Sequence, residues 1–234
     1  MQKIVLFYKK LIEPGGAERL LVNEYIQFKS LGYEVDIVAF KIEDMALFDE
    51  DISDDSKIIL GDANWILSIV NFINYIRKNK KAVYLCASGH IEIYIASLFT
   101  NIEYSLHIHH PSFMSFNETD KYSIFQRKYF KSMLQSNFGA IRFKKILQNM
   151  SLARYFYINL KAYISIKAIR GSKNTFVLSK YAKNEKKILF NISSNVICGA
   201  LDDCIFECIP VEKNAKYHKY KNKILSIARL DENK

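Results

Sequence analysis

The sequence predicts an α/β fold in which a Rossmann-like parallel sheet carries helices on both faces. Short apolar runs rich in β-branched and aromatic residues recur along the chain and indicate strands. Segments whose apolar residues recur at helical spacing separate these runs. Strands that alternate with helices are typical of parallel sheets covered on both faces. The chain has 234 residues, half of them hydrophobic, so it is long enough to bury a substantial core.

The elements follow in order along the chain. Strands are expected at residues 3–8, 34–40, 57–60, 82–86, 104–108 and 174–178. A first helix is expected to end at Leu31-Gly32-Tyr33, and further helices are expected at residues 64–79, 91–99 and 180–190. An acidic loop, residues 49–55, separates the second strand from the third.

A glycine pair, Gly15-Gly16, lies where the first strand turns into the first helix. Glycine lets the backbone approach a ligand closely, and a helix N-terminus presents N–H groups that attract anions. The stretch contains neither GxGxxG nor a glycine-rich loop ending in GK[ST], so it is not one of the common nucleotide-binding motifs. It predicts an anion-binding turn, with a ligand-free strand–helix turn as the alternative.

Other candidate residues also follow predicted strands. Gly89 and His90 come after the fourth strand, and His109 comes after the fifth. Because ligands gather at the carboxyl ends of parallel strands, we expect these residues to converge with Gly15 and Gly16.

Three of the five histidines stand in the stretch His107-Ile108-His109-His110-Pro111. Alternation along a strand predicts that His107 and His109 point to one side and Ile108 to the other. A zinc site would need a third or fourth ligand, and a purely structural cluster is a further alternative. An imidazole can also donate to a hydroxyl or a phosphate, and it titrates near neutral pH.

The net charge of +10 comes from one segment. Residues 121–170 hold eleven of the 34 basic residues and no acidic one, which leaves 23 basic against 24 acidic residues elsewhere. Aromatic residues interleave with these cations. The segment predicts helices that lie on an anionic membrane, with a nucleic-acid groove or ordinary solvated helices as alternatives.

The four cysteines have no zinc or redox spacing and are expected to be reduced cytosolic thiols. The sequence contains no uninterrupted apolar stretch of about 18 residues, so no membrane-spanning helix is expected. The N-terminal apolar run is too short for a signal peptide.

Several stretches, in order, resemble the retaining glycosyltransferases of family four, which have the GT-B fold. The opening contains GGAER, then LLVN, then GYEVDIV. Later stretches that resemble the family are His109-His110-Pro111, FVLSKYAKNEKKILF and NVICGALD, although Cys198 replaces the asparagine usual in the last. The chain ends in RLDENK, the family's Arg-Leu-Asp-x-x-Lys pattern.

The resemblance implies roles for individual residues. His109 would contact the sugar and phosphate as the catalytic residue, and a shift of one position would give this role to His110. Gly15, Gly16, Arg229 and Lys234 would bind the donor diphosphate. Acceptor or sugar contacts would come from Glu18, His90, His110 and Ser179, although an N-cap role is the alternative for Ser179. The membrane-facing cations would be Arg127, Lys128, Lys131, Arg142, Lys144 and Lys145.

The resemblance also implies a domain organisation. Residues 1–208 would form the acceptor-side domain, the N-terminal half of a GT-B fold, with the basic helical segment at 120–170. Residues 209–221 would be a linker, and residues 222–234 would be the first strand of a nucleotide-sugar-binding domain. The chain is therefore expected to be a truncated enzyme with little activity alone, completed by a missing domain or a second chain.

The function expected from the resemblance is transfer of a sugar, of the hexosyl type, from a nucleotide-sugar to a lipid-linked or cell-surface glycan acceptor with retention. No cofactor, metal or nucleic acid is expected, and the location is expected to be cytoplasmic, on the inner face of the membrane. The alternatives are a non-catalytic membrane-surface or nucleic-acid-binding module and a sugar-nucleotide epimerase of the same fold.

Overall fold

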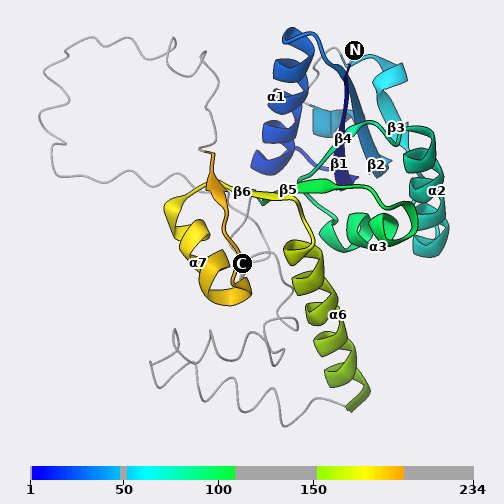
Figure 1. Cartoon of the computed structure of the whole chain (residues 1–234). Helices are drawn as coiled ribbons and strands as arrows, with labels where there is room; N and C mark the ends of the chain where they lie inside the picture. Colours follow the sequence, from blue (N-terminus) through cyan, green and yellow to red (C-terminus); the bar gives the residue numbers. More distant parts are fainter. Residues whose placement is uncertain (1, 48–51, 109–151, 198–234) are drawn as a thin grey trace, which may run out of the picture. The chain divides into compact units, whose positions relative to one another are not determined.

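The computed structural model describes residues 2–47, 52–108 and 152–197 (Figure 1). The chain divides into two compact units, Met1–Gly199 and Ala200–Lys234, and all described residues belong to the first. The predicted linker and the start of a second domain lie outside the described residues.

The described residues form a seven-stranded sheet in the order β3-β2-β1-β4-β5-β6-β7, and every neighbouring pair is parallel. The strands are β1 Lys3–Leu11, β2 Glu34–Ile42, β3 Lys57–Ile59, β4 Val83–Cys86, β5 Tyr104–Ile108, β6 Asn174–Val177 and β7 Asn195–Val196. The predicted Rossmann-like parallel sheet is confirmed. The short β7 has no counterpart among the predicted strands.

Helices connect these strands. They are α1 Gly16–Ser30, α2 Trp65–Lys78, α3 His90–Thr100, α6 Leu152–Arg170 and α7 Lys180–Phe190. The predicted helices are confirmed to within one residue at either end where bounds were given, and α6 confirms a helix in the last part of the basic segment. The described parts of the acidic loop region contain two short 3-10 helices, Asp44–Leu47 and Asp54–Ser56.

Successive side chains of β1 point to opposite faces of the sheet and pack into the hydrophobic core on each face. Leu6 packs among the side chains of α1, whereas Phe7 packs on the side of α2 and α3. The Phe7 ring stacks on Phe72 of α2 with the ring centroids 4.2 Å apart. Figure 1 shows α1 and α2 on opposite sides of β1 and β2. Helices therefore cover both faces, as the apolar runs of the strands require.

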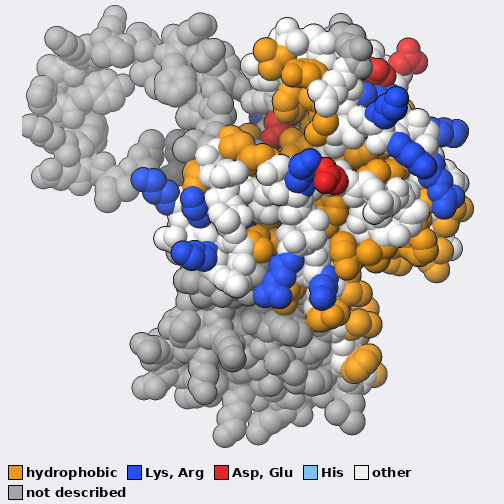
Figure 2. Space-filling model, in the orientation of Figure 1, with side chains coloured by type: hydrophobic (Ala, Val, Ile, Leu, Met, Phe, Trp, Pro, Cys, Tyr) orange, Lys and Arg blue, Asp and Glu red, His pale blue; other side chains and the backbone are white. Residues whose placement is uncertain are grey.

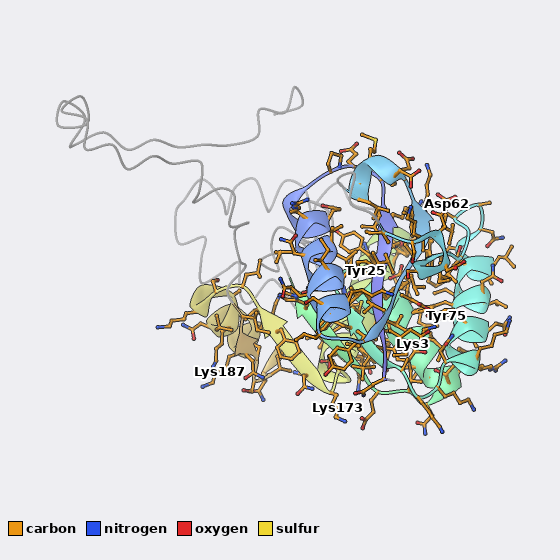
Figure 3. The ribbon with its side chains drawn as sticks, turned by 90° about the horizontal axis from the view of Figure 1, so that it is seen from above. Lys3, Tyr25, Asp62, Tyr75, Lys173 and Lys187 are labelled. Atoms are coloured by element: carbon orange, nitrogen blue, oxygen red, sulfur yellow. The ribbon has the colours of Figure 1, made fainter. Side chains whose placement is uncertain are left out.

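The buried Asp36 carboxylate links the amino-terminal part of β1 to β2 and to α2. Asp36 of β2 accepts a hydrogen bond from Tyr75 of α2 and lies 2.9 Å from the Lys3 Nζ of β1. Figure 3 labels Lys3 and Tyr75 near each other. Burial raises the pKa of the Tyr75 phenol, and the Asp36 charge raises it further, so Tyr75 stays a donor.

Candidate functional site

The glycine turn has the predicted geometry. β1 continues to Leu11, three residues beyond its predicted end, and α1 begins at Gly16. A Cβ on Gly15 would lie 2.5 Å from the Glu18 Oε2, whereas a Cβ on Gly16 would meet nothing within 4 Å. A Cβ on Gly15 would therefore displace the Glu18 carboxylate, whereas Gly16 leaves the start of the helix open to an approaching group.

Glu18 ties this turn to the sheet. Its Oε1 accepts a hydrogen bond of 2.8 Å from the Tyr8 hydroxyl of β1. Burial raises the pKa of Tyr8, and the Glu18 hydrogen bond and charge raise it further. Glu18 thus has a structural partner in β1, while its predicted contact with a sugar stays a prediction.

A cavity of about 750 Å³ opens at the carboxyl ends of β1, β4 and β5. Besides these strands, the described lining residues come from α1, α2, residues 87–89, α3, α6 and α7. The polar and aromatic lining residues are Tyr8, Lys9, Trp65, Ser88, His90, Glu92, Tyr157, Lys161 and Lys186. The cavity lies where a parallel sheet of this kind places its ligands.

The turn after β4 forms one wall of the cavity. Gly89 has φ +86, and a Cβ there would lie 2.8 Å from the Phe7 ring and 3.2 Å from the Lys9 Cβ. Both the left-handed backbone and the lack of space require glycine. The turn therefore brings the start of α3 close against β1.

His90 is the first residue of α3 and lines the cavity. Its Nε2 lies 3.3 Å from the Ser165 Oγ of α6. Burial lowers the pKa of His90 to about 4; the Glu92 charge opposes this, while Lys186 and Lys9 reinforce it. The ring is therefore neutral at pH 7 and suits hydrogen bonding rather than charge pairing. Gly89 and His90 follow β4 as predicted and line the cavity, whereas Gly15 and Gly16 are not among its described lining residues.

Glu92 is the buried acidic residue among those that line the cavity, only 4% exposed. It lies 2.6 Å from the Lys9 Nζ and accepts a hydrogen bond of 3.2 Å from the Trp65 Nε1. Burial by itself raises the pKa of Glu92, but the Lys9 charge and hydrogen bond and the Trp65 donor outweigh it, so the pKa is lowered. None of the three residues, Lys9, Trp65 and Glu92, was predicted from the sequence as part of a site. Of the three, only Glu92 could have been noticed in the sequence, because it is an acidic residue in a mainly apolar helix.

His107 is turned away from the cavity. It is buried in β5, and its Nδ1 pairs with the Glu24 carboxylate of α1. Ile108, the next residue, lines the cavity, so the predicted alternation of these two residues is confirmed. Within the described ranges, no group of three or more His, Cys, Asp or Glu is placed to hold a metal ion.

Ser179 is the N-cap of α7, where its Oγ accepts a hydrogen bond of 3.1 Å from the Ala182 N–H. This is the capping alternative, and Ser179 is not among the described residues that line the cavity. Cys86 does line it, and burial raises the pKa of its thiol, which keeps it protonated. The other cysteines lie outside the described residues.

The remaining predicted residues also lie outside the described part of the chain. They are His109, His110, Arg229, Lys234, Arg127, Lys128, Lys131, Arg142, Lys144 and Lys145. The predicted convergence of His109 with the glycine turn is therefore untested.

Comparison with known proteins shows similarity in fold. No family model matches the chain, and no curated protein matches it. The crystal structure of HepE from Anabaena in complex with UDP-glucose matches with a TM-score of 0.54 at 12% identity, over 88% of this chain and 46% of HepE. The HepE complex with UDP and glucose matches with a TM-score of 0.51 at 11% identity, over the same shares. An α-glucosyltransferase in complex with UDP and a 13-mer DNA matches with a TM-score of 0.48 at 12% identity, over 86% of this chain and 43% of its own.

The fold is thus the α/β, Rossmann-like fold that GT-B glycosyltransferases share. The chain spans about half the length of the solved structures that it matches. Among the described helices, none is long and apolar enough to cross a bilayer.

Proposed function

We propose that this chain is the acceptor-side half of a GT-B glycosyltransferase that transfers a sugar from a nucleotide-sugar. The observation that carries the proposal is the cavity at the carboxyl ends of β1, β4 and β5, beside the glycine turn. The complex of HepE with UDP-glucose, a protein of similar fold, supports a nucleotide-sugar as the donor class.

The chemistry of the cavity agrees with departure of a diphosphate. Lys161 of α6 and Lys186 of α7 line it, and they add positive charge beside the neutral His90. Cations and helix N-termini stabilise the negative charge that develops on a departing diphosphate. The protein would contribute mainly positioning and electrostatic stabilisation, which a retaining transfer needs more than a strong base.

Individual residues would have the following roles in the transfer. His109 would contact the sugar and the phosphate, Gly15 and Gly16 would approach the diphosphate, and Arg229 and Lys234 would stabilise the leaving group. The reaction would retain the anomeric configuration, with a lipid-linked or cell-surface glycan as the acceptor, at the inner face of the membrane. No metal is required by this scheme.

Turnover would also require a donor-binding domain. The chain spans 46% of HepE, which is consistent with one half of such an enzyme. Alone, these 234 residues are expected to bind nucleotide-sugars weakly. Isothermal titration with a panel of UDP-, GDP- and dTDP-sugars measures this, and tight binding by the chain alone would contradict it.

The transfer itself is tested with a panel of nucleotide-sugars and a cell-membrane extract as the acceptor source, following release of the nucleoside diphosphate. The donor half is supplied by co-expressing the nucleotide-sugar-binding domain of a GT-B glycosyltransferase. His109→Ala is expected to lower the rate about a hundredfold, the usual effect of losing one group that stabilises the transition state. His110→Ala tests the alternative register: the hundredfold loss is expected for His109→Ala, and a hundredfold loss for His110→Ala alone would give the role to His110. Equal rates for His109→Ala and the unaltered protein would remove His109 from the site.

A further inference from the structure

Trp65 is exposed at the rim of the cavity. Its side chain is 45% exposed, although a large aromatic ring gains from burial. It is the chain's single tryptophan and the first residue of α2, directly after the Asn64 cap. The indole N–H donates to Glu92 in the first turn of α3, so the orientation of the ring is restrained from a second helix.

The charges beside Trp65 compensate one another. Glu92 and Lys9 lie 2.6 Å apart, so the carboxylate neutralises the ammonium locally. The Lys9 side chain is 42% exposed at the cavity, so its ammonium can also reach a ligand. His90, two residues before Glu92, is neutral at pH 7. Beside Trp65 the cavity therefore offers a donor and an acceptor whose charges compensate, whereas its other lysines, Lys161 and Lys186, come from α6 and α7.

We infer that Trp65, Glu92 and Lys9 form a subsite for a neutral pyranose ring, the sugar of the acceptor. This inference rests on the proposed function and specifies what the same cavity receives. The indole face would pack against the C–H face of the sugar, and the Glu92 carboxylate and the Lys9 ammonium would bind its hydroxyls.

The chemistry favours a sugar over other ligands. An anion at this place would meet the Glu92 carboxylate, which is buried and ionised. A purely apolar ligand would exclude water from the partly exposed Lys9 ammonium, which is costly. A pyranose ring combines an apolar face with hydroxyls that both donate and accept. It therefore matches a restrained indole beside a compensated ion pair.

The experiment uses the full chain, an immobilised panel of neutral glycans and the fluorescence of the single tryptophan. A bound glycan is expected to shift the Trp65 emission, because the ring leaves water when a sugar packs on it. Trp65→Ala is expected to weaken binding of that glycan at least tenfold on the panel. Lys9→Met, which removes the ammonium but keeps the apolar stem, is expected to weaken it several-fold.

Ile66→Ala is the matched control. Ile66 is the next residue of α2, is 67% exposed and is absent from the described cavity lining, so its replacement is expected to leave glycan binding unchanged. Circular dichroism checks that each variant is folded. The inference is overturned if no glycan shifts the Trp65 emission, or if Trp65→Ala binds the glycans as the unaltered chain does. The transfer assay is a separate measurement: binding without transfer would contradict the proposed function and leave the subsite standing.

Discussion

His90 illustrates how the surroundings of one side chain set its chemistry. In the unfolded chain its pKa is near 6.5, and in the folded chain burial lowers it to about 4. Between these pH values the unfolded chain binds a proton at His90 that the folded chain does not bind. The free energy of unfolding therefore falls as the pH is lowered through this window.

We expect the contribution of His90 to this loss to reach about 3 kcal/mol at pH 4. Urea unfolding at pH 7, 5.5 and 4.5 measures it. His90→Asn is expected to be less sensitive to pH across this range. Ser165→Ala, which removes the hydrogen-bond partner but keeps the titrating ring, should keep the pH dependence. If His90→Asn and the unaltered chain lose stability in parallel, the lowered pKa is wrong.

At the scale of one element, α2 shows how a cap positions a functional side chain. The Asn64 side chain accepts hydrogen bonds from the N–H groups of Ile66 and Leu67, at 2.9 and 3.4 Å. These donors have no partner within the helix, so the cap satisfies them. The capped turn begins at Trp65, which is thereby held at the rim of the cavity.

Asn64→Ala is expected to lower the free energy of unfolding by about 1 kcal/mol. It is also expected to broaden the Trp65 emission, because the first turn of α2 frays. Denaturant unfolding and fluorescence measure both effects. Asn74→Ala is the control, since Asn74 is exposed on the same helix away from the cap, and its change is expected to stay within about 0.5 kcal/mol. Equal losses for the two variants would contradict the role of the cap.

On the described surface of the molecule, basic and apolar side chains occur together along α6. The helix α6 exposes large apolar side chains together with Lys167 and Arg170. The exposed apolar residues of α6 are Phe156, Tyr157, Leu160 and Tyr163, of which Tyr157 and Leu160 also line the cavity. Figure 2 shows hydrophobic side chains at the lower right of the described surface, where α6 lies in Figure 1. We propose that this helix and the basic residues that precede it in sequence bind an anionic membrane surface.

The chain is expected to sediment with vesicles that contain anionic lipids and not with neutral vesicles. Replacing Arg142, Lys144 and Lys145 by Gln is expected to weaken this binding about a hundredfold, at roughly 1 kcal/mol for each cation. Replacing Lys78, Lys80 and Lys81 by Gln changes the net charge equally and serves as the control. Equal weakening by both triple variants would mean that net charge alone, and not this segment, drives binding. Tighter binding to DNA in a salt series would favour the nucleic-acid alternative.

Much of the fold could be predicted from local patterns. The strand, glycine pair and helix at the start of the chain were predicted, and so was the turn at Gly89-His90. The end of β1 was predicted too early, because Lys9 and Lys10 interrupt the apolar run while the backbone continues to pair with β2. The predicted end of β1 followed from the polarity of Lys9 and Lys10, whereas its observed end at Leu11 follows from backbone pairing with β2.

Local patterns along the chain are enough to predict the parallel sheet, its covering helices and the glycine turn, because strand and helix periodicity and backbone freedom are local properties. Only the tertiary structure brought Lys9, Trp65 and Glu92 together. They belong to β1, α2 and α3, and no local pattern relates residues so far apart in the chain. They meet because α2 and α3 pack side by side on one face of the sheet, which places the first turns of both helices beside the carboxyl end of β1.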